Sequence, residues 1–115
     1  MSIGLVKKLK VGPYTYPVKL VKNLTHKGEE QKGLFDSYTG IEIDDSMPED
    51  MQAEVLLHEL LHSIFFMMNV EKIQGTSALE EIFVTQFGTG LATVFKNNPE
   101  LLTYFKKALK WTLRT

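Results

Sequence analysis

The chain has 115 residues, no cysteine and a formal net charge of −1 at pH 7, with 43% hydrophobic and 23% charged residues. This length and composition predict one globular domain, residues 1–115. The near-neutral charge gives no electrostatic reason to expect a nucleic acid or an anionic membrane as a partner. Without cysteine the chain has no disulfide and no thiolate metal site, which is compatible with the cytoplasm, where we expect it. Its longest apolar run, Ile64–Met68, is too short to span a bilayer.

The first third of the chain predicts strands. Pro17 lacks a backbone donor, so we expect its strand to begin there or to lie at a sheet edge. Residues 25–32 are compatible with a loop or a short helix. Ile41 and Ile43 would face inward from the second strand of a hairpin that turns at Thr39-Gly40. The expected strand segments are residues 5–11, 14–24, 34–38 and 41–44.

The remaining two thirds predict three helices. The first runs from about Pro48 to Asn69, after a capping-box pattern formed by Ser46 and Glu49. The second runs from Ser77 to Lys96, and the third starts at Asn98-Pro99. The expected fold is therefore α+β, with a small N-terminal antiparallel sheet followed by three helices.

The most informative pattern is His58-Glu59-Leu60-Leu61-His62, within the first predicted helix. Residues four apart lie on one helical face with Cβ atoms about 5–6 Å apart, so His58 and His62 can each give one nitrogen to the same ion. Glu59 projects from the neighbouring sector, where it can reach a metal-bound water without being a ligand. Zinc lowers the pKa of such a water towards about 7, and a carboxylate beside it can take the proton and pass it to a leaving amine.

The alternative interpretation is a chance pattern in a packed helix without any metal. The neighbouring segments Val55–Leu57 and Ile64–Phe66 are apolar. Polar groups buried there without partners would cost about 1–3 kcal/mol each, and a bound metal supplies the partner. The pattern and its helical context therefore favour a metal site.

The motif, followed by a glutamate at the start of the next helix, resembles the gluzincin type of zinc metallopeptidase. The order of elements over residues 33–105 resembles small single-domain metallopeptidases of phages and prophages, distant relatives of the ImmA/IrrE type. The resemblance implies a zincin-like fold with Zn²⁺ held by His58, His62 and Glu80, and Glu59 as general base. It also implies a peptide or protein substrate and, for a phage-encoded protein, the host cytosol.

Spacing does not distinguish Glu80 from Glu81 as the third ligand, but periodicity does. Glu80 lies at the centre of an apolar arc of the second helix, where an ionised carboxylate needs a cation, whereas Glu81 points towards the polar flank with Thr85. Thermolysin-like gluzincins have an acidic residue four positions after the ligand glutamate, and here Val84 stands there, which leaves the partner of the histidines open. The oxyanion donor is also open, with candidates Tyr14, Tyr16, Tyr38 and His26.

Two functional classes follow. The first is a zinc-dependent peptidase, in which the strand Ile41–Ile43 could pair with an extended substrate. The second is a non-catalytic, zinc-stabilised binding or regulatory module of phage origin. Substitution of Glu59 distinguishes them, because only the peptidase depends on that carboxylate.

Overall fold

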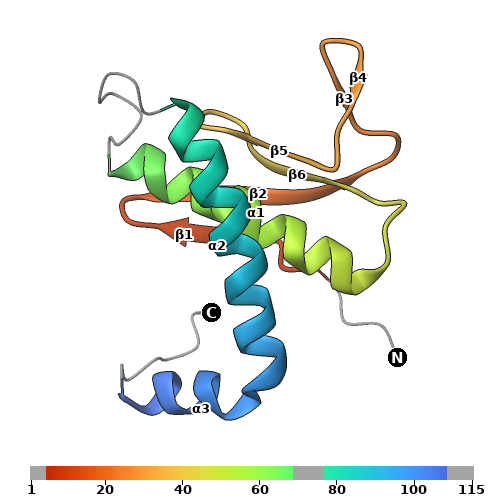
Figure 1. The fold of residues 1–115 in the computed structure, drawn as a ribbon. Helices are drawn as coiled ribbons and strands as arrows, with labels where there is room; N and C mark the ends of the chain where they lie inside the picture. The colour runs from red at the N-terminus through yellow and green to blue at the C-terminus, as the bar shows by residue number, and fades with distance from the viewer. Residues whose placement is uncertain (1–4, 69–76, 109–115) are drawn as a thin grey trace.

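The computed structural model describes residues 5–68 and 77–108, which form a four-stranded sheet, a two-stranded sheet and three helices (Figure 1). The predicted α+β class, with a small sheet ahead of three helices, is confirmed. The expected end of the first helix at Asn69 lies just outside the described residues. The strands are β1 Lys8–Val11, β2 Tyr14–Val21, β3 Thr25–His26, β4 Glu29–Glu30, β5 Gly33–Asp36 and β6 Gly40–Asp44. The helices are α1 Glu49–Met67, α2 Ser77–Asn97 and α3 Pro99–Ala108.

The main sheet is mixed rather than wholly antiparallel, with the strand order β1-β2-β6-β5. β1 and β5 each pair antiparallel with their neighbour, and β5 and β6 form the predicted hairpin. β2 and β6 are parallel, with Val18 opposite Ile41, because the intervening chain returns β6 to the direction of β2. Pro17 therefore lies in an internal strand, but the β6 ladder begins only at Val18, after the residue that lacks the donor.

Residues 25–32, compatible by sequence with a loop or a short helix, contain the β3–β4 hairpin. His26 pairs with Glu29 across a two-residue turn. Lys27 and Gly28 have φ angles of 54° and 81°, the left-handed conformation that such tight hairpin turns require. The hairpin projects beyond the main sheet (Figure 1). His26 is exposed on it.

The core lies between the main sheet and α1. Ile43 and Ile41 are 0% and 1% exposed, which confirms that they face inward, and Val55 and Leu56 of α1 pack against this cluster. α2 crosses α1 on the side away from the sheet, and α3 follows beyond it (Figure 1). α1 is therefore covered on two sides, as expected of a helix with apolar residues on both.

The predicted capping box at the start of α1 does not form. Pro48 occupies the N-cap position without a side-chain cap. The Ser46 hydroxyl instead donates to the Asp44 carboxylate, which also accepts the backbone N–H of Leu24 at 2.9 Å. Asp44 thus joins the β6–α1 connection to the loop after β2, and this competing acceptor takes the hydroxyl that a cap would need.

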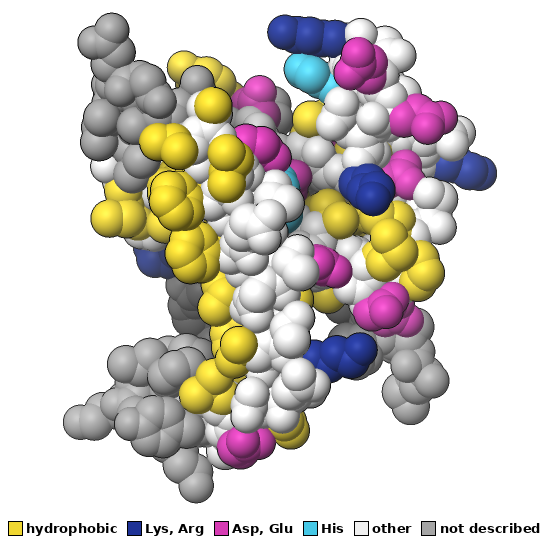
Figure 2. Space-filling model, in the orientation of Figure 1, with side chains coloured by type: hydrophobic (Ala, Val, Ile, Leu, Met, Phe, Trp, Pro, Cys, Tyr) yellow, Lys and Arg dark blue, Asp and Glu magenta, His cyan; other side chains and the backbone are white. Residues whose placement is uncertain are grey.

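One side of α2 is apolar and exposed. Figure 2 shows apolar side chains along it, and Leu79, Ile82, Phe83 and Phe87 are each between 46% and 58% exposed. The side that faces α1 carries Val84, which is 0% exposed. Within residues 5–68 and 77–108, no helix has the length and apolar character needed to cross a membrane.

Candidate metal centre

α1 presents the two motif histidines to the first turns of α2. The rings of His58 and His62 lie one helical turn apart, with centroids separated by 5.0 Å. α2 approaches closely at Gly88, where an added Cβ would lie 3.7 Å from the Cα of His58. Buried Val84 and Gly88 are one turn apart, and this line of contact brings the start of α2 over both rings.

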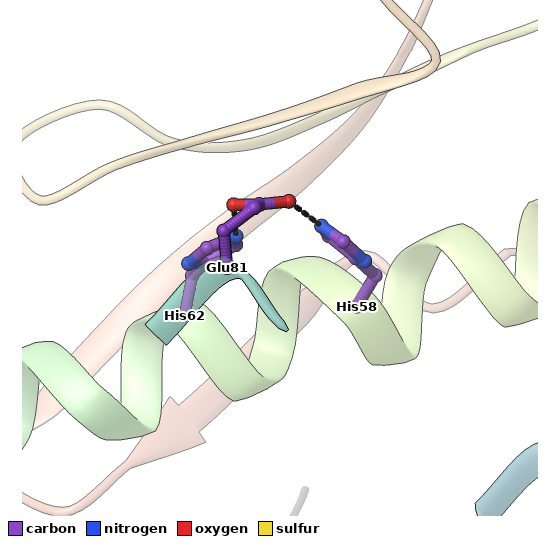
Figure 3. Close-up of side chains that lie close together, drawn as sticks. All are labelled: His58, His62 and Glu81. Carbon is purple, nitrogen blue, oxygen red and sulfur yellow. Dashed lines mark ion pairs between the residues drawn. The ribbon is translucent and has the colours of Figure 1, made fainter. Parts of the chain in front are cut away.

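The carboxylate of Glu81 spans the two rings (Figure 3). Its Oε1 lies 3.3 Å from Nε2 of His58, and its Oε2 lies 3.1 Å from Nε2 of His62. One ligand atom from each of these three residues falls within 4.8 Å of the others. His58, His62 and Glu81 therefore could hold a metal ion.

Glu80 makes a different contact. Its Oε2 lies 2.8 Å from Nδ1 of His62, the nitrogen that does not face Glu81, and both of these side chains are largely buried. The group that could hold a metal ion therefore contains Glu81, whereas the expectation that Glu80 is a ligand stays a prediction. Val84 of the apolar arc of α2 is buried, but Phe83 and Phe87 of the same arc are exposed, so the side of α2 that faces α1 is turned from the centre of the arc towards the polar flank.

Burial sets the protonation state of His58. Loss of solvent, followed by the nearby His62, lowers the pKa of His58 below its ordinary value, and Glu81 opposes this shift. The neutral form, whose ring keeps a nitrogen lone pair, is therefore favoured. A lone pair is what an imidazole needs to bind a metal.

Glu59 lies on the side of α1 that faces β5 and is only 7% exposed. Burial raises the pKa of Glu59 to about 7; His62 lowers it and Glu81 raises it further, both to a smaller extent. The two motif rings thus face Glu81, and Glu59 stands beside them, outside the group that could hold a metal ion. A carboxyl group with a pKa near neutrality is suited to exchange protons at physiological pH.

In the metal-free protein, Glu59 is expected to make the free energy of unfolding fall between pH 4.5 and about 7. Its pKa is 4.5 ordinarily and about 7 in the folded chain, so in this range the folded state holds a proton that the unfolded state releases. Below pH 4.5 the protonated Glu59 makes its full contribution to the free energy of unfolding, and this contribution is lost as the pH rises through about 7. The loss is at most about 3 kcal/mol, at 1.36 kcal/mol per pKa unit.

Urea unfolding with a chelator, compared between the wild type and Glu59→Gln across this range, checks this pH dependence. The lowered pKa of His58 acts in the opposite sense, but His58 is present in both proteins, so the difference between the two curves isolates Glu59. Parallel curves would show that Glu59 titrates normally.

Gly33, the first residue of β5, lies against Glu59. A Cβ at this position would come within 2.6 Å of Cγ1 of Val55 and 3.1 Å of Oε2 of Glu59. We expect Gly33→Ala to destabilise the fold by about 1–3 kcal/mol and to displace the carboxylate. Gly90→Ala is the control, because nothing lies within 4 Å of that position and alanine favours a helix. Equal stabilities in urea unfolding would contradict the predicted clash.

A cavity of about 440 Å³ opens beside His58 and Glu59. The segment before β5 forms one wall, α1 the floor, and the polar flank of α2 the other wall. None of the four candidate oxyanion donors is among the described residues that line it. The polar side chains that do line it had no functional role predicted from the sequence; they are Glu30, Gln31, Lys32, Glu54, Thr85 and Thr89. Only Thr85 and Thr89 had a local signal, the polar flank of the second helix.

The strand order of the sheet places a different strand beside the site from the one that was expected. β6 is internal, with β2 on one side and β5 on the other, so the expectation that Ile41–Ile43 pairs with a substrate is wrong. β5 is an edge strand, as is β1 on the far side of the sheet, and Gly33 at the start of β5 lines the cavity. Among the described residues no strand pairs with the outer edge of β5, which leads to the candidate metal site.

Comparisons of the chain with protein-family models, with curated proteins and with solved structures find no match. Any functional assignment consequently rests on the residues of this site and their geometry.

Proposed function

We propose that this protein is a zinc-dependent peptidase of the gluzincin type, in which His58, His62 and Glu81 hold Zn²⁺ and Glu59 is the general base. The observation that carries the proposal is the convergence of two imidazoles and one carboxylate beside a buried glutamate with a near-neutral pKa. The proposal keeps the roles that the motif predicted for His58, His62 and Glu59 and moves the third ligand from Glu80 to Glu81.

The donor set and its spacing suit zinc. With metal–ligand bonds of 2.0–2.2 Å, two ligand atoms of a tetrahedral zinc site are about 3.3 Å apart. Oε1 of Glu81 lies 3.3 Å from Nε2 of His58 and its Oε2 lies 3.1 Å from Nε2 of His62, and one ligand atom from each of the three residues lies within 4.8 Å of the others. Calcium and magnesium prefer oxygen ligands throughout, whereas two imidazoles favour zinc or a similar transition metal. Three protein ligands are the pattern of catalytic zinc, which keeps a further position open.

The chemistry expected of the bound zinc is to polarise the scissile carbonyl and to make water acidic at neutral pH. Positive charge at the site favours the ionised form of Glu59, the form that accepts a proton. Glu59 takes one proton from the attacking water as its oxygen bonds to the carbonyl carbon. Glu59 then returns this proton to the amide nitrogen as the C–N bond breaks. One peptide bond and one water are consumed, and one carboxylic acid and one amine are formed.

The cavity and the neighbouring strand edge favour an extended peptide as the substrate. A peptide could add to the open edge of β5 through backbone hydrogen bonds and place one side chain in the 440 Å³ cavity. Strand addition uses few side-chain contacts, which suits a chain with little surface left for separate binding pockets.

Metal analysis followed by a peptide-library cleavage assay tests the proposal. Protein purified without added zinc and then reconstituted is expected to contain one zinc per chain and to cleave a subset of peptides. Less than one zinc per chain after reconstitution would remove the metal site and the proposal with it. One zinc per chain without cleavage of any peptide would favour the non-catalytic module.

A further inference from the structure

We propose that Glu80 is a positioning residue: it holds His62 in the tautomer that carries the proton on Nδ1 and so directs the lone pair of Nε2 to the metal. This inference rests on the proposed function. It assigns separate roles to two adjacent glutamates, with Glu81 as the ligand and Glu80 behind the ligand histidine.

The His62 ring is held at both of its nitrogens. Nδ1 lies 2.8 Å from Oε2 of Glu80, and Nε2 lies 3.1 Å from Oε2 of Glu81. The side chains of His62 and Glu80 are 18% and 15% exposed, whereas that of Glu81 is 61% exposed. The shorter contact is therefore also the more buried one, where water competes least for the hydrogen bond.

The number of protons on the His62 ring determines which of its two nitrogens donates to a glutamate. A neutral imidazole has one N–H and one lone pair, and an ionised carboxylate only accepts. If Nδ1 donates to Glu80, Nε2 faces Glu81 with its lone pair, an arrangement that needs a cation between them or a second proton on the ring. A metal ion at His58, His62 and Glu81 meets this need without protonating the ring.

The helix geometry explains why adjacent residues can divide these roles. Successive residues of α2 point about 100° apart, so two neighbouring carboxylates can approach the same ring from two directions. Neither Val84 nor Thr85, one turn further along α2, carries a carboxylate. The carboxylate that orients His62 therefore comes from the residue directly before the ligand, and a hydrogen bond of this kind also makes the ligand nitrogen more basic.

Zinc affinity, measured by competition with a chelator, is the first test. Glu80→Ala is expected to bind zinc about 10–100-fold more weakly while still reaching one zinc per chain at saturation. Glu80→Gln keeps an acceptor oxygen for Nδ1–H and is expected to recover part of this loss. Glu100→Ala, which removes a carboxylate from α3, is the control for net charge.

Nitrogen NMR of the histidine rings tests the same contact without zinc. In the metal-free Glu81→Ala protein, which lacks the carboxylate at Nε2, the proton of the neutral His62 ring is expected on Nδ1. Adding Glu80→Ala to this variant is expected to abolish that preference. Because no metal is needed, this result separates a failure of the Glu80 role from a failure of the proposed peptidase.

Two results would overturn the proposal. In the first, Glu80→Ala binds zinc as tightly as the wild type and His62 keeps its tautomer. In the second, Glu80→Ala fails to reach one zinc per chain at saturation while Glu81→Ala reaches it, which would make Glu80 the ligand.

Discussion

Glu59→Gln is expected to lower kcat/KM for peptide hydrolysis by about 10²–10⁴-fold, the usual contribution of a general acid–base group. The amide has nearly the same shape but does not accept a proton at neutral pH. Zinc should remain bound at one ion per chain, because Glu59 lies outside the group formed by His58, His62 and Glu81. Rates on a peptide selected from the library, together with elemental analysis of both proteins, check the two halves of this prediction.

Glu29→Gln is a matched control for the Glu59 experiment, because it makes the same change on the exposed β3–β4 hairpin. It is expected to leave the rate unchanged. If the wild type cleaves the peptide and Glu59→Gln cleaves it equally well, Glu59 is not the base. If Glu59→Gln instead loses its zinc, the residue belongs to the ligand set and the division of roles on α1 has to be redrawn.

Added zinc is expected to raise the melting temperature of the wild type by roughly 10 °C at a free zinc concentration of 100 Kd. Binding only to the folded state contributes about 2.7 kcal/mol at this concentration, and 1 kcal/mol shifts the melting temperature of a domain of this size by about 4 °C. The proposed ligands come from α1 and α2, so the site exists only while these two helices are packed together.

The zinc-induced rise in melting temperature, measured for single variants, compares the contributions of the proposed ligands to zinc binding. His58→Ala and Glu81→Ala are expected to respond little to zinc, whereas Glu80→Ala should keep a reduced response at a fixed zinc concentration. Magnesium, which prefers oxygen ligands, is the control cation and should have little effect on the wild type. A zinc response that survives in Glu81→Ala and disappears in Glu80→Ala would return the ligand role to Glu80.

Local patterns were sufficient for the elements that carry the motif. The i, i+4 spacing of His58 and His62 places both rings on one face of a helix regardless of what surrounds that helix. The hairpin that turns at Thr39-Gly40 and the starts of α2 at Ser77 and α3 at Pro99 were also predicted, because turn residues and helix periodicity act over a few neighbouring positions.

Competing local partners limited the prediction at finer scale. Ser46 had the right spacing from Glu49 for a capping box, but its hydroxyl donates a hydrogen bond to the nearby Asp44 carboxylate instead. The parallel pairing of β2 with β6 depends on the path of the chain between them, which includes a second hairpin that the sequence did not clearly indicate. The edge position of β5 beside the cavity follows from that path.

By itself, the sequence determined that a helix would present two histidines and a glutamate suited to a metal site. Only the tertiary structure decided that Glu81 faces both rings while Glu80 lies behind His62. A periodic pattern gives the apolar direction of α2, and the side that faces α1 is turned from that direction towards the polar flank, because Val84 is buried while Phe83 and Phe87 are exposed. The rotation of α2 about its own axis is set by its close packing on α1 at Val84 and Gly88, a contact between distant parts of the chain that no local pattern encodes.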